Sequence, residues 1–495
     1  MIVDFDGRTV IFLYDMLGGD NCMKRLLVCI LLLLLLPIGC AGNQNADNTT
    51  SAGPYIDTGS DYTYVMEDWR DRKWEIDIVS FANAYLDPDH GHPQLTDRWT
   101  MWYYFNDTNM QYAQSDLVNY FDPELKARFI DKINSLILSI PELSDDEINF
   151  GLMESAAMLH DLHSYVSLSM PDEVLPFDVM PVDYNGETFG MIWGGSSDVS
   201  ELIGKLLIAI NDIPLDEVRE RIRPIIGYEN EASFEALSYS YSYLMNWDVL
   251  RYIGVMDEGH FAWITVRDFD GTERKYQITS ESYADTWSED YSVEYYKNAN
   301  MFTDAGIYQK DLNDQNNVWY HLMKQGEVLY IRFTSCIVDE SVGEVFDDAF
   351  QAADANEKCQ TVILDFRVNS GGYSDLSGNF VKLAEYLETC EAQVFILIDN
   401  NSFSAAIGIP AVLRRRLKDA TLIGSAGGQQ PRFFRGESFS LPYSQIYCQC
   451  SSELVDFWPN YENETLTPDL IVRQTYEDYL NGYDSVLKYI LASGN

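Results

Sequence analysis

One serine in this chain of 495 residues sits where a nucleophile could act. Residues 394–398 are apolar and predict a buried strand, a polar turn follows, and Ser404-Ala405 opens a stretch with helical character. A helix start carries unpaired N–H groups and partial positive charge, which suit a nucleophile whose tetrahedral intermediate is an anion. Serine is also a favoured helix N-cap, so this position alone does not decide between the two roles.

A nucleophilic serine needs a base, because its hydroxyl is barely ionised near neutral pH. The chain has six histidines. His163 lies in the tetrapeptide D-L-H-S, directly after a segment with helical periodicity, whereas His90, His92, His260 and His321 lie in or near predicted loops and turns. A single histidine is more often structural than catalytic, so His163 needs support from other features.

A glycine pair forms the third feature. Residues 365–372, D-F-R-V-N-S-G-G, follow a predicted buried strand. Gly371 and Gly372 let the backbone turn sharply and approach a ligand closely. The N–H groups of such a turn can stabilise an oxyanion, although many tight turns have two glycines without this role.

Together these features resemble the tail-specific (C-terminal processing) and tricorn-core family of serine proteases. The family motifs D-x-R-x-N-x-G-G, S-A and G-x-x-G-G match residues 365–372, 404–405 and 424–428. The tricorn-like branch adds D-x-H-[ST] and E-N-x-x-x-x-P-D, which match residues 161–164 and 462–469. The resemblance runs from about residue 62 to the end of the chain, in the family's order. It therefore favours the nucleophile over the N-cap for Ser404.

The resemblance implies a role for each matching residue. Ser404 would be the nucleophile, His163 the general base and Glu462 the group that orients the base. The oxyanion hole would consist of backbone N–H groups in the glycine loop and at the helix start, contributed by Gly371, Gly372 and Ala405.

Three positions depart from the family pattern. Ile407 stands three places after the serine, where a polar residue is common. Gln429 occupies the place of the tail-specific lysine, which argues against a Ser-Lys dyad. Leu162 precedes His163 where the tricorn core protease has a serine, so Glu462 would contact His163 directly or through water.

Alternating strands and helices must position these residues. From about residue 325 the pattern predicts strands at 328–333, 361–366, 394–398 and 421–423, and helices at 342–352, 376–387 and 404–418. Repeated βα units predict a sheet with helices packed on it. The resemblance implies an α/β fold whose catalytic core, residues 325–495, is a crotonase-like (ClpP-like) βα spiral.

Three predicted segments precede this core. Residues 62–172 form a helical cap region, with Trp69, Ile76, Phe81 and Tyr85 at helical spacing and a capping box, S-D-D-E, at 144–147. Residues 173–260 resemble the family's PDZ-like insert, which binds peptides as an added strand; a spacer domain without a peptide groove is the alternative. Residues 261–324 connect to the core and contain a predicted hairpin turn at Asp270-Gly271.

The N-terminus resembles a bacterial lipoprotein signal. Lys24 and Arg25 precede an apolar run that is too short to span a bilayer and ends in L-P-I-G-C. Cys40 is therefore the predicted lipidation site, with an ordinary secretory signal as the alternative. The predicted boundaries are a signal segment at residues 1–40, whose true start is Met23, and a linker at 41–61.

Composition narrows the possible functions. The formal net charge of −45 disfavours nucleic acid as a partner, and 46% hydrophobic residues allow a substantial core. The sequence has no CxxC and no Cys/His cluster with zinc spacing, so we predict neither metal nor cofactor. The five cysteines beyond the N-terminal segment are interpreted mostly as small core residues.

The sequence thus predicts a lipid-anchored, extracytoplasmic serine peptidase, either an endopeptidase or a C-terminal processing enzyme, acting through an acyl-enzyme on Ser404. Its predicted partners are peptide or protein substrates and, through the anchor, the cell membrane; the oligomeric state is left open. One alternative is a catalytically inactive, peptide-binding lipoprotein of the same fold. Another is an acyl-CoA enzyme on a crotonase-like fold, which the signal sequence and the acidic charge disfavour.

Overall fold

The structure is a computed structural model of the chain. It describes residues 2–5, 8–11, 64–86, 100–104, 111–115, 123–168, 171–257, 259–287, 293–295, 317–337, 341–356, 358–372 and 379–493. Met23, the lipidation site Cys40 and the linker at 41–61 lie outside the described residues. Within the described ranges, no helix has the length and apolar character needed to cross a membrane.

The chain forms two compact units. One comprises Met1–Gly53 and Trp287–Tyr291, and its described strands are β1 (Ile2–Phe5) and β2 (Arg8–Ile11), which pair as an antiparallel hairpin. The other comprises Pro54–Thr286 and Ser292–Asn495, and it contains all the predicted catalytic residues.

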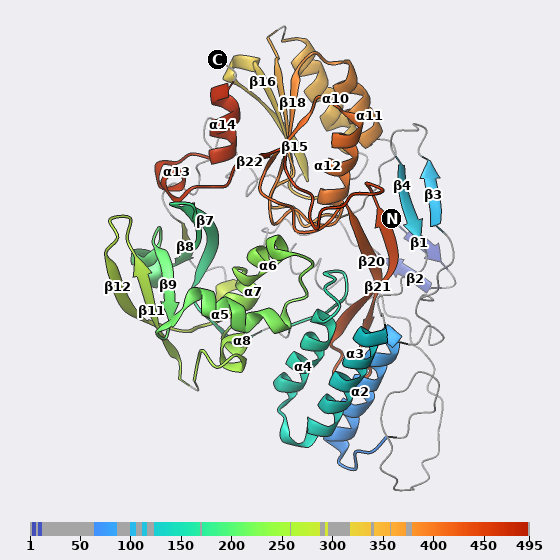
Figure 1. Cartoon of the computed structure of the whole chain (residues 1–495), viewed down its shortest axis with the longest axis vertical. Coiled ribbons are helices and arrows are strands. Elements are labelled where there is room, and N and C mark those ends of the chain that lie inside the picture. Colours follow the sequence, from blue (N-terminus) through green and yellow to red (C-terminus); the bar gives the residue numbers. More distant parts are fainter. Residues whose placement is uncertain are drawn as a thin grey trace. The chain divides into compact units, whose positions relative to one another are not determined.

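A six-stranded sheet organises the C-terminal part of the larger unit (Figure 1). Its order is β15-β16-β17-β18-β19-β22; β15 runs antiparallel to β16, and the other neighbours are parallel. The strands are β15 (Val318–Met323), β16 (Val328–Phe333), β17 (Thr361–Asp365), β18 (Gln393–Ile398), β19 (Thr421–Gly424) and β22 (Leu470–Ile471). Each predicted strand of this region is found, within one residue at its ends.

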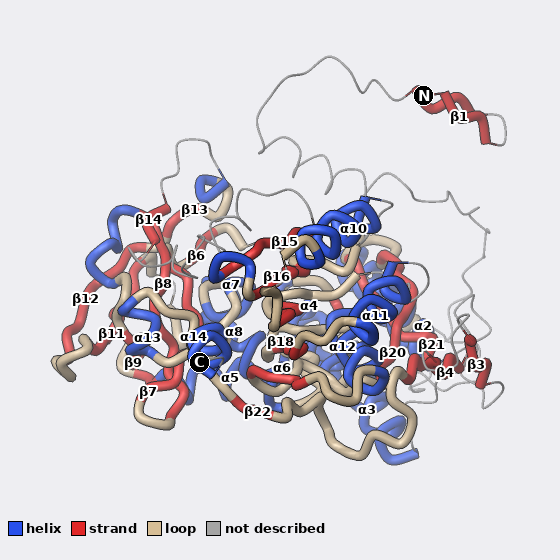
Figure 2. Tube along the Cα trace, turned by 90° about the horizontal axis from the view of Figure 1, so that it is seen from above, coloured by secondary structure: helices blue, strands red, loops and turns tan. Residues whose placement is uncertain are grey.

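Helices cover both faces of this sheet, which explains why its central strands are mostly apolar. Helices α10, α11 and α12 share one apolar core with the sheet, and α14 packs on a separate core at the opposite face (Figure 2). Their bounds are α10 (Ser341–Asp354), α11 (Asn379–Thr389), α12 (Ala405–Arg416) and α14 (Ser485–Ser493). The βα alternation predicted from the sequence is therefore confirmed.

A seven-stranded antiparallel sheet lies in the middle of the sequence. Its order is β12-β11-β9-β8-β14, with β7 paired to β8 and β10 to β9. The strands are β7 (Phe177–Tyr184), β8 (Glu187–Ser196), β9 (Leu206–Ile210), β10 (Ile213–Pro214), β11 (Phe261–Arg267), β12 (Glu273–Thr279) and β14 (Val293–Tyr295). The predicted hairpin joins β11 to β12, with Gly271 at φ 86°. The sheet thus continues past residue 260.

Short helices surround this sheet. The predicted strand–turn–helix after residue 206 is present, because β9 ends at a turn with positive φ at Asn211 and Asp212 and α5 follows. The helices are α5 (Leu215–Ile222), α6 (Glu231–Ser238), α7 (Tyr241–Leu244), α8 (Trp247–Tyr252) and, near the C-terminus, α13 (Tyr476–Asn481). A further pair of two-residue strands is β6 (Glu173–Val174) with β13 (Glu281–Ser282).

The predicted cap region contains three helices, α2 (Trp69–Leu86), α3 (Pro123–Ser139) and α4 (Asp145–Ala157). The predicted capping box is present, since Ser144 Oγ accepts the Glu147 N–H and the Glu147 carboxylate accepts the Ser144 N–H. The predicted stripe on α2 is wrong at Trp69, which is 61% exposed in the first turn. The buried stripe begins one turn later, at Trp74 and Ile78.

The expectation that residues 62–172 are only helical is also wrong, because this region contributes three strands. They join a five-stranded sheet with two strands from near the C-terminus. Its members are β3 (Thr100–Tyr104), β4 (Gln111–Ser115), β5 (Tyr165–Val166), β20 (Arg432–Ser440) and β21 (Tyr447–Asp456). The pairing of β5 with β21 holds the D-L-H-S segment, just before β5, against the C-terminal part of the chain.

Candidate active site

Ser404 occupies a sharp turn between β18 and α12. Its φ of 55° and ψ of −121° lie outside the regions that residues with a side chain favour, which costs about 1–3 kcal/mol. The Ser404 side chain makes no capping hydrogen bond to α12, so the N-cap role is not the one realised. The nucleophile elbow of α/β-hydrolases has the same arrangement, a serine on a strained strand-to-helix turn with its Oγ exposed.

His163 lies next to this serine although 241 positions separate them in the sequence. Its Nε2 is 3.2 Å from Ser404 Oγ, within reach for proton transfer. The imidazole stacks on the Phe403 ring with centroids 4.6 Å apart. The His163 carbonyl accepts a hydrogen bond from Gln449 of β21, which anchors the loop. The structure therefore brings together the two residues predicted as nucleophile and base.

Burial shifts the protonation of His163. The ring is only 8% exposed, and this burial lowers the pKa of His163 below its ordinary value, with Asp161 acting in the opposite direction. A lowered pKa leaves the imidazole neutral near pH 7, and only the neutral ring can accept the serine proton.

Asp161 holds the histidine loop in shape. One of its oxygens accepts the His163 backbone N–H at 2.9 Å, and the other accepts the hydroxyls of Ser164 and Ser451, both at 2.6 Å. Ser164 Oγ in turn accepts the Ser451 N–H at 3.0 Å. Asp and Ser of the D-x-H-S motif therefore fix the backbone around the base.

The glycine loop lies directly against Ser404. A Cβ on Gly371 would stand 2.7 Å from Ser404 Cβ and 3.0 Å from the Ala405 nitrogen, and Gly371 has a φ of 94°. Its N–H donates to Asn369 Oδ1 at 2.8 Å, so Gly371 is not available as an oxyanion donor. Gly372 follows it, and Ala405 is the first residue of α12, where an N–H has no partner within the helix.

Asn369 explains the spacing of the motif. Its Oδ1 accepts the Gly371 N–H, its Nδ2 donates to the Phe333 carbonyl at 2.8 Å, and its own carbonyl accepts the Phe403 N–H at 3.0 Å. The buried Asn369 therefore ties the glycine loop to strand β16 through its side chain, and to the turn that carries Ser404 through its backbone carbonyl.

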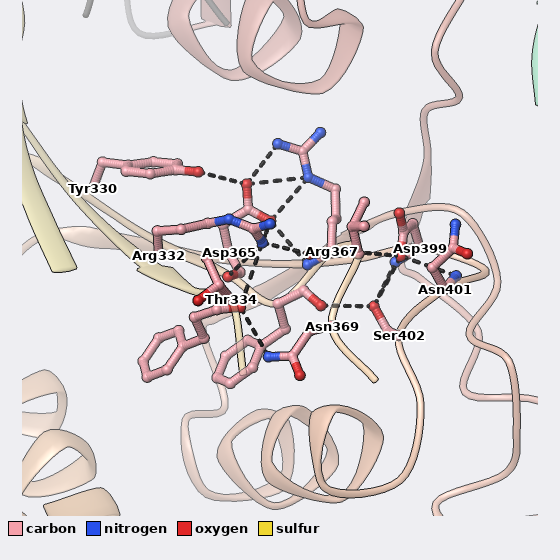
Figure 3. A network of polar contacts seen from close by, with 12 residues as sticks. Tyr330, Arg332, Thr334, Asp365, Arg367, Asn369, Asp399, Asn401 and Ser402 are labelled. Atoms are coloured by element: carbon pink, nitrogen blue, oxygen red, sulfur yellow. Dashed lines mark hydrogen bonds and ion pairs between the residues drawn. The ribbon is translucent and has the colours of Figure 1, made fainter. Parts of the chain in front are cut away.

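The earlier motif residues form the polar network of Figure 3. Asp365 accepts hydrogen bonds from the Tyr330 hydroxyl at 2.8 Å and from Arg367 Nε at 2.9 Å. Arg367 also binds Asp484, which precedes α14, with Nη2 and Oδ2 2.7 Å apart. The arginine thus ties the loop after β17 to the C-terminal helix.

A cavity of about 500 Å³ borders this network. Its lining combines the ends of the core strands with β7, β8 and α6, and includes Val179, Trp193, Tyr239, Arg332, Arg367 and Asn400. Neither Ser404 nor His163 lines it, so this cavity is distinct from the reacting atoms.

Two polar side chains at the site were not assigned catalytic roles from the sequence. Glu229 Oε1 accepts hydrogen bonds from Gln429 Nε2 at 2.9 Å and from the Leu162 N–H at 3.3 Å. Gln429 Oε1 accepts the backbone N–H of Ser404. In the sequence, Gln429 marks only the place of the missing lysine, and Glu229 belongs to no motif. Their positions near Ser404 and His163 are visible only in the folded structure.

Glu462, predicted to orient the base, is exposed on the segment that follows β21. The rest of its motif has structural contacts: Asp469 binds Arg414 and accepts the Leu422 N–H at 2.8 Å. The carboxyl groups that the structure places near His163 are those of Asp161 and Glu229. The orienting role of Glu462 stays a prediction.

Asp161, His163 and Glu229 also bear on metal binding. One ring nitrogen and one oxygen from each carboxyl group lie within 4.8 Å of one another, close enough to hold a small cation. Both oxygens of Asp161 already accept hydrogen bonds, so a cation would have to compete with these donors. Catalysis without a metal stays a prediction.

Comparisons with known proteins place the fold. No protein-family model matches the chain, and no curated protein matches its sequence. Among solved structures, mature CPAF complexed with lactacystin aligns with a TM-score of 0.50 and 13% identity, over 74% of this chain and 91% of CPAF. The photosystem II D1 C-terminal processing protease also matches, with a TM-score of 0.35 and 10% identity over 81% of this chain and 94% of that protease. The tricorn protease matches with a TM-score of 0.34 and 14% identity over 76% of this chain and 35% of the tricorn chain. The chain therefore shares a mixed α/β fold with CPAF.

Proposed function

We propose that this protein is a serine peptidase of the tail-specific and tricorn-like type, with Ser404 as nucleophile and His163 as base. The observation that carries the proposal is the 3.2 Å contact between Ser404 Oγ, on its strained turn, and Nε2 of the buried His163. The motifs in family order and the fold shared with CPAF support it.

The geometry supports an acyl-enzyme mechanism. His163 Nε2 takes the hydroxyl proton of Ser404 as Oγ attacks the carbonyl carbon of the scissile peptide bond. The N–H groups of Gly372 and Ala405 stabilise the oxyanion that forms. The imidazolium then gives its proton to the leaving amine, and water activated by the same histidine releases the acyl group from Ser404.

Further features complete the proposal. The core is crotonase-like, and the seven-stranded sheet is PDZ-like, as the strand–turn–helix of β9 and α5 supports. The enzyme acts outside the cytoplasm on peptides or proteins, anchored through a lipid on Cys40. The same site would serve an endopeptidase, which cleaves inside a substrate chain, or a C-terminal processing enzyme, which cleaves near the substrate's C-terminus.

A fluorophosphonate probe tests the proposed chemistry, because it reacts only with an activated serine. We expect labelling of the wild-type protein at the peptide that contains Ser404, and none in Ser404→Ala. A folded wild-type protein that takes up no label would contradict the proposal and favour the catalytically inactive, peptide-binding alternative.

A further inference from the structure

A single carboxyl oxygen connects the predicted base to the predicted nucleophile. Glu229 Oε1 accepts both the N–H of Leu162, which precedes the base, and Nε2 of Gln429. The other end of the Gln429 amide accepts the N–H of Ser404. Gln429 is fully buried, and its amide donates to Glu229 and accepts the Ser404 N–H. A shift of Glu229 would therefore also move the strained turn at Ser404.

Glu229 is also close to the ring of the base. One of its oxygens lies within 4.8 Å of a His163 ring nitrogen and of an Asp161 oxygen. Both oxygens of Asp161 accept hydrogen bonds from other groups: the His163 backbone N–H and the hydroxyls of Ser164 and Ser451. Both carboxyl groups therefore lie near the imidazole, and Glu229 is the one that is also linked to Ser404, through Gln429.

We propose, resting on the peptidase function above, that Glu229 is a positioning residue for this reaction. It holds His163 and Ser404 in register, with Gln429 as its bridge. In this role it takes the place that the motif comparison assigns to Glu462. Such a link matters because a displacement of about 1 Å at reacting groups can cost about 100-fold in rate.

The charge of Glu229 adds a pH dependence to this role. Burial, with a contribution from Asp161, raises the pKa of Glu229 to about 8, so the group is largely neutral at pH 7. When it ionises, its negative charge stabilises the imidazolium that forms as Ser404 loses its proton. The groups that face Glu229 are Asp161 and His163 on one side, and Gln429 and the Leu162 N–H, whose hydrogen bonds it accepts.

The test measures the rate of fluorophosphonate labelling at Ser404 in four variants of the full chain: Glu229→Ala, Glu229→Gln, Glu231→Gln and Glu462→Gln. Glu229→Ala should be slower than wild type by about 100-fold. Glu229→Gln keeps an acceptor for Leu162 and Gln429, and should recover most of the rate at pH 7. The matched control is Glu231→Gln, two residues away on the surface of α6, which should label like wild type.

The pH profile separates positioning from general structural support. The wild-type rate should rise a second time near pH 8, as Glu229 ionises, and Glu229→Gln should lack this second rise. Wild-type rates in Glu229→Ala, a second rise that persists in Glu229→Gln, or a larger loss in Glu462→Gln than in Glu229→Ala would each overturn the inference. If Glu229→Ala does not fold, the Glu229→Gln profile decides. Absence of labelling in the wild type would refute the proposed function instead.

Discussion

Gly371→Ala should disable the site through a defined steric contact. The new Cβ would meet the Phe403 carbonyl oxygen and Ser404 Cβ, both at 2.7 Å, and these atoms belong to the strained turn itself. A backbone oxygen cannot move aside without moving the turn. We therefore expect displacement of the nucleophile and of the Ala405 donor beside it.

The size of the effect follows from two contributions. A Cβ at φ 94° costs about 1–2 kcal/mol of stability through backbone strain alone. Displacing an oxyanion donor costs about 100- to 1,000-fold in kcat, or about 2.7–4 kcal/mol. Gly186→Ala is the matched control, because Gly186 has a φ of 84° and open space where its Cβ would stand.

The assay combines thermal unfolding with kcat for a peptide substrate. Both variants should lose a similar amount of stability from strain, with an added loss in Gly371→Ala from the contact. Only Gly371→Ala should lose activity. A folded Gly371→Ala protein that turns over like Gly186→Ala would refute the reasoning that the glycine loop must lie against the nucleophile.

Three further predictions concern pH, metals and the anchor. Burial lowers the pKa of His163, so the first rise of kcat/KM with pH should have its midpoint below about 6.5, the ordinary pKa of histidine. A midpoint above about 6.5 in the pH–rate profile would contradict the buried environment of the ring. Peptidase activity should persist in excess chelator, and loss of activity that zinc restores would show that a metal is required. Mass spectrometry of the mature protein should find a lipidated N-terminal Cys40, and Cys40→Ala should leave the membrane fraction; continued membrane association without a lipid mass would disprove the anchor.

The sequence predicted those parts of the molecule that local pattern determines. Buried parallel strands are mostly apolar, and the predicted bounds of β16 match its observed bounds because residues 328–333 follow a polar segment. The capping box at Ser144 was equally visible, since both of its hydrogen bonds lie within four consecutive residues. The βα alternation then placed Ser404 and the glycine loop at the ends of neighbouring strands.

Features that depend on distant segments were not predictable in the same way. Glu229 and Gln429 are 200 positions apart and meet only when the segment before α6 packs against the segment that follows β19. Trp69 has the spacing of a buried residue but lies on the first turn of α2, where it meets the Tyr443 ring in a T-shaped contact and stays 61% exposed. The strained φ of Ser404 follows from the turn that β18 and α12 impose, and serine itself has no preference for it.

The most direct test of the account is kcat/KM for one peptide substrate in wild type, His163→Ala, Ser404→Ala and the double variant, with Lys418→Ala as the test of a lysine base. We predict a loss of several orders of magnitude in each single catalytic variant, and nearly the same loss in the double variant, because residues of one catalytic unit fail together. Lys418→Ala should turn over normally, since Lys418 lies beyond the C-terminal end of α12, far along the helix from Ser404. Near-normal turnover in His163→Ala would contradict the account and remove the histidine from the mechanism.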